Sequence, residues 1–401
     1  MRILVHDYAG HPFQVQLSRE LARMGHTVKH AYASALQTPR GELTVRPDDP
    51  EGFSVEEVPM HPKYKDWKYS FVKRQHLEIG YGRKLAKLVR TWKPDAVLSS
   101  NTPTEPQASL LEATKKVGAR FVYWVQDFYS IAVDKIVRQK LPVVGTLVGS
   151  YYKTLDRQQF RASDHIVPIT DDFSPLLEDD FGVKSDRITP IPNWAPLESL
   201  PQRPKDNPWS REYNLQDKFV YLYTGTLGMK HNPGLLLSLA QEMEADDDVA
   251  VVVVSEGIGA EFLKEKKETL GLENLVILPY QPFDQLPNVL GSGDVLTCIL
   301  EPDAGIFSVP SKVLTYLCAG RPLLLAVPPE NLAARIIREE NAGLTVGPKD
   351  TEGFLDAATS LLDDQSLCEE YSNNSRKYAE FTFDIEKIGL KFTDIIENQI
   401  P

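Results

Sequence analysis

The sequence predicts an α/β protein made of two doubly wound, Rossmann-like domains that face one cleft. Short apolar, β-branched runs alternate with amphipathic helical segments along most of the 401 residues, and such alternation is typical of parallel sheets. A chain of this length suggests two domains. A proline-rich stretch at 191–208 separates two series of alternating segments and is the predicted linker.

The first half begins with a strand at 3–5, a loop containing Gly10 and a helix over 14–24. A second strand at 27–32 completes a strand–helix–strand unit, whose strands must run parallel. Further strands are predicted at 96–98, 121–125 and 166–169. The stretch 36–70 is rich in proline, glycine and charge and is predicted to be irregular.

The second half repeats this pattern after the linker. Its clearest strand is the continuous apolar run at 249–254, which is typical of burial on both faces of a sheet. Other strands are predicted at 219–223, 276–278, 295–297 and 323–327. Helices are predicted at 234–242, 312–318, 331–340 and 351–362. These segments make a second doubly wound sheet.

Composition and charge exclude several classes of protein. With 42% hydrophobic and 25% charged residues, the chain is not collagen, coiled coil or generally disordered. The net charge of −12 argues against nonspecific nucleic-acid binding, which depends on Lys and Arg neutralising phosphates. The charge is +3 over residues 1–200 and −15 over 201–401. The two halves are therefore expected either to have different partners or to differ only in their solvated surfaces.

Cysteine usage and hydropathy predict the compartment. The three cysteines, Cys298, Cys318 and Cys368, are too few for a disulfide framework and lack CxxC spacing, which favours a reducing compartment. The run at 3–5 is too short for a signal peptide, and no run is long enough for a membrane span. We expect a cytoplasmic protein. Without clustered Cys/His spacing, no structural metal is expected either.

A glycine loop follows the strand at 219–223. Gly225 and Gly228 would let backbone N–H groups approach a phosphate, and the next helix N-terminus adds partial positive charge. Lys230 would supply a full charge. Because the loop matches neither GxxxxGK[ST] nor GxGxxG, a plain glycine turn with a solvated lysine stays open.

A second candidate segment begins at Pro310, which is suited to the start of a helix. Ser311 and Lys312 fall in the first turn, where a lysine is unfavourable to the helix dipole unless an anion is bound at the same end. The alternative is a lysine that points into water. Gly320 is predicted to end the helix.

Together these segments resemble the retaining group 1 glycosyltransferases of GT-B fold, the glycogen-synthase-like enzymes. The resemblance is carried by Gly-Thr-Leu at 225–227, by the block 310–322 that begins Pro-Ser-Lys and ends Ala-Gly-Arg-Pro, by Ile-Pro-Asn-Trp at 191–194, and by the N-terminal glycine loop. It covers nearly the whole chain. The most similar subgroup is that of bacterial enzymes that build polysaccharides or glycolipids.

The resemblance implies that the second half binds the diphosphate of a nucleotide-sugar donor. The implied diphosphate site comprises Gly225, Thr226, Lys230, Pro310, Ser311 and Lys312. The turn at 279–282 would recognise the base, with Gln281 reading uracil or a similar base. Glu256 lies in a turn that the family places near the nucleotide, although a plain strand-exit turn is an equal alternative.

Two positions depart from the family pattern. Aligned on Gly320–Pro322, the family's paired glutamates, separated by seven residues, fall at Phe307 and Thr315. Thr315 offers the ribose only a neutral hydrogen bond, which is weaker than one to a carboxylate. Glu301 or Asp303 on the preceding loop is the candidate to replace the first glutamate near the donor sugar.

The first half is expected to bind the acceptor. Asp127, at the end of the strand 121–125, is the candidate carboxylate that orients or deprotonates the acceptor hydroxyl, unless it only caps the next helix. Asn101 and His11 are candidates for the acceptor pocket. Gly10 would allow close approach to the donor phosphate.

The predicted domains are 1–197, joined by a terminal helix over about 385–401, and 198–384. The predicted reaction moves a sugar from a nucleotide-diphosphate sugar, a UDP-sugar first, to an acceptor hydroxyl without a metal or cofactor. The alternatives are a UDP-sugar epimerase of the same architecture and a non-catalytic partner subunit that has lost the glutamates.

A lipid-linked acceptor would bring the chain to a membrane. The segment 135–161 mixes cations with apolar residues and is expected either to lie on an anionic membrane face or to pack as an ordinary helix on the sheet. The expected partners are therefore the donor, a sugar or lipid-linked sugar acceptor, and the inner face of a membrane by peripheral contact.

Overall fold

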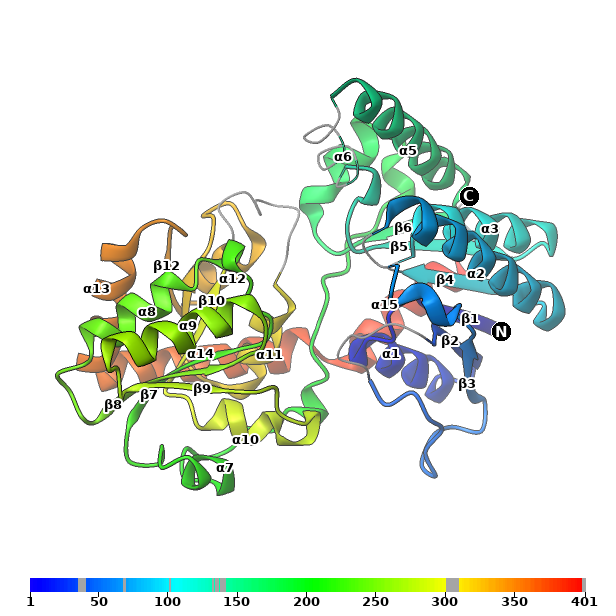
Figure 1. Cartoon of the computed structure of the whole chain (residues 1–401). Coiled ribbons are helices and arrows are strands. Elements are labelled where there is room, and N and C mark those ends of the chain that lie inside the picture. The colour runs from blue at the N-terminus through cyan, green and yellow to red at the C-terminus, as the bar shows by residue number, and fades with distance from the viewer. Residues whose placement is uncertain are drawn as a thin grey trace. The chain divides into compact units, whose positions relative to one another are not determined.

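The computed structural model describes residues 1–34, 41–67, 70–100, 102–131, 133, 137, 142–300 and 310–398 (Figure 1). The chain divides into two compact units. The first comprises Met1–Asn193 with Ile385–Pro401, and the second comprises Trp194–Asp384. The division lies four residues before the sequence-based boundary between 197 and 198.

The first unit holds a six-stranded parallel sheet in the order β3-β2-β1-β4-β5-β6. Its strands are β1 (Arg2–Asp7), β2 (Thr27–Ala33), β3 (Phe53–Val58), β4 (Ala96–Ser100), β5 (Arg120–Val125) and β6 (His165–Pro168). Its α-helices include α1 (Pro12–Arg23), α2 (Phe71–Trp92), α3 (Thr104–Lys116), α5 (Pro142–Ala162), α6 (Ser174–Asp179) and α15 (Ile385–Glu397). Helix α2 packs on α3 and α3 on α5, while α1 packs on α15.

The second unit holds a six-stranded parallel sheet in the order β12-β11-β10-β7-β8-β9. Its strands are β7 (Phe219–Thr224), β8 (Val249–Val254), β9 (Leu275–Leu278), β10 (Val295–Ile299), β11 (Leu323–Ala326) and β12 (Gly343–Val346). Its α-helices include α7 (Pro208–Glu212), α8 (Gly234–Glu242), α9 (Ile258–Leu270), α10 (Leu286–Gly291), α11 (Ser311–Ala319), α12 (Leu332–Glu339), α13 (Thr351–Asp363) and α14 (Gln365–Thr382). The predicted α/β class with two parallel sheets is confirmed.

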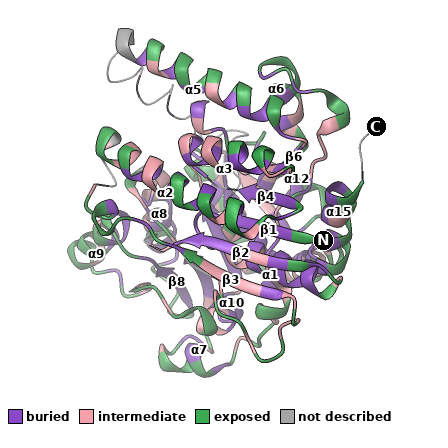
Figure 2. Cartoon of the chain, turned by 90° about the vertical axis from the view of Figure 1, so that its right-hand side faces the viewer, coloured by how far each residue is buried: buried purple, intermediate pink, exposed green. Residues whose placement is uncertain are grey.

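Burial explains why these segments form strands (Figure 2). Every residue of β4, β8 and β10 is buried, as the continuous apolar runs of central parallel strands require. The edge strand β3 is only partly buried, and its Ser54, Glu56 and Glu57 dilute the apolar signal. The prediction that 36–70 is irregular is therefore wrong for Phe53–Val58, which pairs in parallel with β2.

Strand β12 was not predicted either. It is four residues long and begins at Gly343, whose φ of +154° suits glycine. A Cβ there would lie 2.0 Å from the carbonyl oxygen of Leu323. The glycine that masks the strand pattern in the sequence is thus what lets β12 approach β11.

Among the described residues, no helix is both long and apolar enough to cross a membrane.

Candidate functional site

Each sheet reverses its strand order once. The reversal lies between β1 and β4 in the first unit and between β7 and β10 in the second. Connections leave in opposite directions at such a point, which opens a crevice at the carboxyl ends of the strands where ligands of α/β proteins bind. Most of the predicted site residues follow these strands, so each unit is described from its own reversal point.

In the second unit the structure brings Gly225 and Lys312 together. Gly225 directly follows β7 and has a φ of +101°, which favours glycine. A Cβ on Gly225 would lie 3.5 Å from both Cε and Nζ of Lys312, in the first turn of α11. Segments 87 residues apart in the sequence thus meet at one strand end.

Two tyrosines fix this arrangement. The hydroxyl of Tyr316, one turn after Lys312, accepts a hydrogen bond from the Thr224 backbone N–H at 2.9 Å. The hydroxyl of Tyr223 donates to the backbone oxygen of Thr226 at 2.7 Å. Helix α11 and the glycine loop are therefore both anchored to the end of β7.

The charge of Lys312 has no carboxylate partner among the described residues. Its Nζ lies 3.8 Å from the centroid of the Tyr223 ring, a cation–π contact. Burial lowers the pKa of Lys312 to about 8, and the nearby Cys298 opposes that shift only weakly. The ammonium group is thus charged at neutral pH and able to pair with an anion.

The start of α11 carries no capping side chain. Pro310 occupies the N-cap position, and Ser311 in the first turn is exposed. Within the described parts of the chain, the first-turn N–H groups of α11 therefore have no capping side chain, and they add partial positive charge beside Lys312. Thr315 lies one turn after Ser311 on the same side of the helix and is half-buried.

Gln281 and Glu256 shape the turn that follows β9. The Gln281 Oε1 accepts a hydrogen bond from the Trp209 indole N–H at 3.1 Å, and its Nε2 donates to the Pro279 carbonyl at 2.9 Å. Glu256 accepts from the Tyr280 backbone N–H at 3.3 Å. The base-reading role of Gln281 stays a prediction, and these contacts show that its amide already has partners.

A pocket of about 570 Å³ opens at the carboxyl ends of β11 and β12. Its lining residues are Pro328, Pro329, Glu330, Gly347, Pro348, Lys349 and Asp350. Asn232, which follows the glycine loop, donates to the Pro348 carbonyl at 3.4 Å. The loop and the pocket therefore share the same edge of the sheet. The side chain of Lys230, and all of Asp303, lie outside the described parts of the chain.

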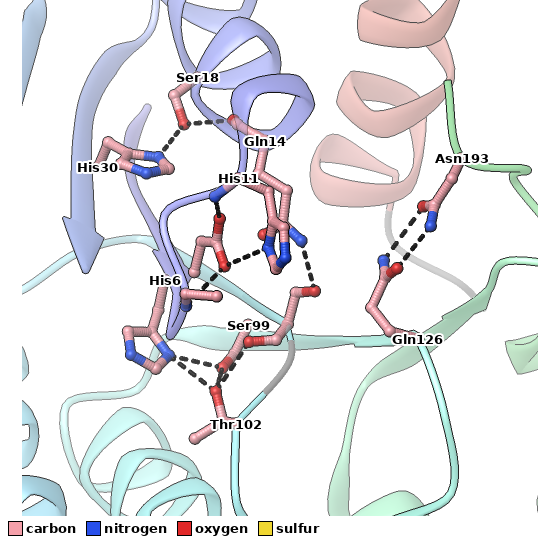
Figure 3. Close-up of polar contacts among 12 residues, drawn as sticks. His6, His11, Gln14, Ser18, His30, Ser99, Thr102, Gln126 and Asn193 are labelled. Atoms are coloured by element: carbon pink, nitrogen blue, oxygen red, sulfur yellow. Dashed lines mark hydrogen bonds and ion pairs between the residues drawn. The ribbon is translucent and has the colours of Figure 1, made fainter. Parts of the chain in front are cut away.

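In the first unit a buried carboxylate organises the loop after β1 that carries His11, which Figure 3 labels. Asp7 accepts hydrogen bonds from the backbone N–H groups of Ala9, at 3.0 Å, and of His11. The His11 Nδ1 lies 3.2 Å from the Asp7 Oδ1. Gly10, with a φ of +80°, makes the tight turn between them.

This pair also sets the charge of His11, the N-cap residue of α1. Burial alone would lower the pKa of His11, but the hydrogen bond and charge of Asp7 outweigh it and raise that pKa. Burial alone would raise the pKa of Asp7, and the contacts with His11 lower it instead. The predicted acceptor residue His11 is thus held in a fixed orientation with its protonated form favoured.

A second buried network, which the sequence analysis missed, joins β1 to β4. The His6 Nδ1 lies 3.1 Å from the Ser99 hydroxyl and 3.0 Å from the Thr102 hydroxyl, as Figure 3 shows. The His6 Nε2 lies 2.8 Å from the Tyr81 hydroxyl. Burial lowers the pKa of His6 to about 3, so this imidazole is neutral. Isolated polar residues inside apolar runs gave no signal that they would converge.

The other two predicted acceptor-side residues of the first unit are Asp127 and Asn101. Asp127 lies on the turn directly after β5 and is exposed. Its neighbour Gln126 exchanges hydrogen bonds of 3.2 and 2.6 Å with the side chain of Asn193. Asn101 lies outside the described residues.

The sequence analysis also missed a buried acid on α2. Glu78 accepts from the Tyr64 hydroxyl at 3.0 Å and lies 3.4 Å from the Arg74 Nε. Burial raises the pKa of Glu78 to about 7, against the attraction of Arg74. Within the described residues, no group of three or more His, Cys, Asp or Glu side chains is arranged to hold a metal ion.

Comparison with known families accounts for both units. The model of the glycosyl transferase 4-like domain matches residues 11–194, and the model of glycosyl transferases group 1 matches residues 206–378. The chain therefore consists of a glycosyl transferase 4-like domain followed by a glycosyl transferases group 1 domain. The catalytic class expected from the sequence, a glycosyltransferase, is confirmed at this level.

Relatives of this glycosyltransferase are distant. WcaI of Escherichia coli strain K12, named as a glycosyl transferase of colanic acid biosynthesis, is 25% identical over 318 residues, which cover 77% of this chain and 75% of WcaI. Anabaena HepE, solved in complex with UDP-glucose, is 14% identical with a TM-score of 0.70 over 98% of each chain. A Listeria monocytogenes structure titled as a UDP-N-acetylglucosamine 2-epimerase is 13% identical with a TM-score of 0.61, over 100% of this chain and 98% of that one. These structural likenesses show the fold, which is GT-B.

Proposed function

We propose that this group 1 glycosyltransferase moves a sugar from a UDP-sugar to a hydroxyl of a sugar or lipid-linked sugar, with retention at the anomeric carbon, in the synthesis of a cell-surface polysaccharide or glycolipid. The observation that carries the proposal is Lys312, held 3.5 Å from the Cβ position of Gly225 without a carboxylate partner among the described residues. The name of WcaI supports the pathway, and the UDP-glucose complex of HepE supports the donor.

The proposed chemistry is electrostatic on the donor side. The bond between the anomeric carbon and the diphosphate oxygen breaks, and the electron pair leaves with the diphosphate. Lys312 and the first-turn N–H groups of α11 stabilise the charge that develops there. The acceptor oxygen forms the new bond on the face from which the diphosphate leaves, because attack from the opposite face would invert the anomeric carbon. Its proton passes to a carboxylate, for which Asp127 is the candidate. No metal or cofactor takes part in this proposal.

Removing the charge of Lys312 tests the proposal. We expect Lys312→Ala to weaken UDP binding by roughly 10- to 100-fold, because a charge-assisted contact to phosphate is lost. Lys264→Ala, an exposed lysine on α9 of the same unit, is the matched control and should bind UDP normally. Calorimetric titration with UDP and GDP measures both. Equal affinities of the parent and Lys312→Ala for both nucleotides would overturn the proposed diphosphate site.

Two alternatives are distinguished by simple assays. The fold shared with the Listeria protein keeps an epimerase possible, and conversion of a UDP-sugar with no acceptor present would favour it. The neutral residues Phe307 and Thr315, at the positions of the family's glutamates, favour a non-catalytic partner subunit. That subunit would bind UDP but neither transfer nor hydrolyse the sugar.

A further inference from the structure

The outer surfaces of α2 and α5 in the first unit carry positive charge only. Each helix contains a single carboxylate, Glu78 in α2 and Asp156 in α5, and both are buried. The exposed charged residues of the two helices are Lys73, Arg83, Lys84, Lys87, Arg90, Lys153, Arg157 and Arg161. On a chain of net charge −12, this concentration of cations requires its own explanation.

Apolar side chains are exposed within this cationic surface, at the N-terminal halves of both helices. Val72 is 73% exposed, Leu147 is 71% exposed and Tyr151 is 52% exposed. Nearby, Trp67 lies under the ammonium groups of Lys63 and Lys73, which are 5.4 and 5.1 Å from its ring centroid. Single exposed apolar residues are ordinary, but several among cations are typical of an interfacial surface.

A network of hydrogen bonds connects the two helices. The Gln75 amide, one turn into α2, donates to the Tyr152 hydroxyl of α5 at 3.0 Å, and both groups bind Glu105 at 2.6 Å. The Tyr151 ring packs edge-on against Tyr152 at 5.3 Å. The first turns of α2 and the middle of α5 are therefore connected through Glu105 of α3, and exposed residues lie along both helices (Figure 2).

The surface has a clear boundary. Toward the C-terminal end of α5, Arg157 donates to the Asp180 carbonyl at 2.7 Å, and the acidic run 178–180 is exposed there. An anionic partner would be repelled from that end. In a parallel α/β unit, helices begin at the sheet edge where strands end, so the N-terminal halves lie toward the same edge as Asp7 and His11.

We propose that this docking patch binds the surface of an anionic phospholipid bilayer. The patch is defined as Lys63, Lys65, Trp67, Val72, Lys73, Leu147 and Tyr151, with the exposed carboxylate of Asp66 between Lys65 and Trp67 in the chain. Its cations face lipid phosphates and its apolar and aromatic side chains enter the interface. The exposed Leu and Val favour lipid over nucleic acid, which would need the cations alone. Membrane binding by the patch does not depend on the proposed function. Only its role does, which is to hold the acceptor-binding unit near a lipid-linked substrate.

Vesicle co-sedimentation of the full chain tests the proposal. The parent should sediment with vesicles of phosphatidylcholine mixed with phosphatidylglycerol, bind pure phosphatidylcholine weakly, and be released by salt. Lys73→Ala should lower partitioning about fivefold, and Leu147→Ser with Tyr151→Ser about tenfold or more. The controls are Lys87→Ala, at the far end of α2, and Phe381→Ser, a 76% exposed side chain of the second unit.

The outcomes are distinct. Loss of binding in the patch variants alone, with UDP affinity unchanged, supports the docking patch. No binding to anionic vesicles, or equal losses in patch and control variants, overturns it whatever the UDP titration shows. Tight binding of duplex DNA that Leu147→Ser with Tyr151→Ser leaves unchanged would instead assign the surface to a nucleic acid. UDP binding, measured separately, decides the proposed function on its own.

Discussion

At the reversal of its strand order, the first sheet ends in buried polar groups that bind one another, whereas the second sheet ends beside a cation that has no acidic partner among the described residues. His6 is neutral and contacts Ser99, Thr102 and Tyr81, while Lys312 lies over the ring of Tyr223 and close to the Cβ position of Gly225. The two units have the same topology but carry different groups at the carboxyl ends of their strands. The polar groups of the first satisfy one another, and we propose that an anion completes the second.

The largest expected effect comes from filling the space beside the second unit's glycine loop. Gly259, in α9, donates its N–H to the Leu227 carbonyl at 3.1 Å, and a Cβ there would lie 2.3 Å from that oxygen. Gly259→Val must displace the loop backbone, so we expect a loss of about 3 kcal/mol in unfolding free energy and loss of UDP binding. Denaturant unfolding and UDP titration measure both effects.

Gly80→Ala is the control for that experiment. A Cβ at Gly80, inside α2, would meet nothing within 4 Å, so alanine should be neutral or stabilising by up to about 1 kcal/mol. If Gly259→Val unfolds at the parent's denaturant concentration and binds UDP normally, the loop is not held by this contact.

How far the sequence predicted the fold depended on burial. The continuous run of β8 is buried throughout and was predicted with its correct bounds, because a central parallel strand shows its apolar character at every residue. Phe53–Val58 and Gly343–Val346 were missed because edge strands mix polar residues or glycine into the pattern. Local composition therefore identified central strands better than edges.

The candidate site divides in a similar way. Gly225 and Lys312 carried a local signal, a glycine after a strand and a lysine at a helix start, and the structure brings them together. His6 and Ser99 carried none, because their pairing depends on the parallel register of β1 and β4, in which they lie opposite each other. Convergence of distant buried residues is a property of the sheet register rather than of any short motif.

Removing the first unit's buried carboxylate should have the next largest effect. Asp7→Asn replaces one of the two carboxylate oxygens that accept backbone N–H bonds by an NH2 donor, so we expect a loss of about 1–3 kcal/mol in unfolding free energy at pH near 6. The pKa of His11 should fall, because the charge that raises it is gone. NMR titration of the His11 ring measures that pKa, and Asp66→Asn, at an exposed position, is the control.

The pKa shifts of Asp7 and His11 together set how the stability loss of Asp7→Asn depends on pH. The pKa of Asp7 is below its ordinary 3.8 in the folded chain, so its contribution is present above 3.8 and is lost as the pH falls. The pKa of His11 is above its ordinary 6.5, so its contribution is present below 6.5 and is lost as the pH rises. The difference between parent and Asp7→Asn should therefore be largest between these two values. An unchanged His11 pKa in Asp7→Asn would show that the two residues are not coupled. The other titratable groups that interact with Asp7 are His6, His30 and Tyr81.

The smallest effect concerns the protonation of the second unit's cation. Because burial lowers the pKa of Lys312 to about 8, UDP affinity should decline above that pH and, one pH unit higher, should fall to about a tenth of its value with the lysine fully protonated. Lys312→Arg keeps its charge throughout and should bind UDP with a flatter profile. The ionisation of UDP itself affects both proteins equally. The ratio of their UDP affinities therefore reports the protonation of Lys312 alone. Calorimetric titrations across this pH range supply that ratio. Parallel pH profiles for the two proteins would mean that the Lys312 ammonium does not contact the diphosphate. The proposed difference between the edges of the two sheets would then be wrong.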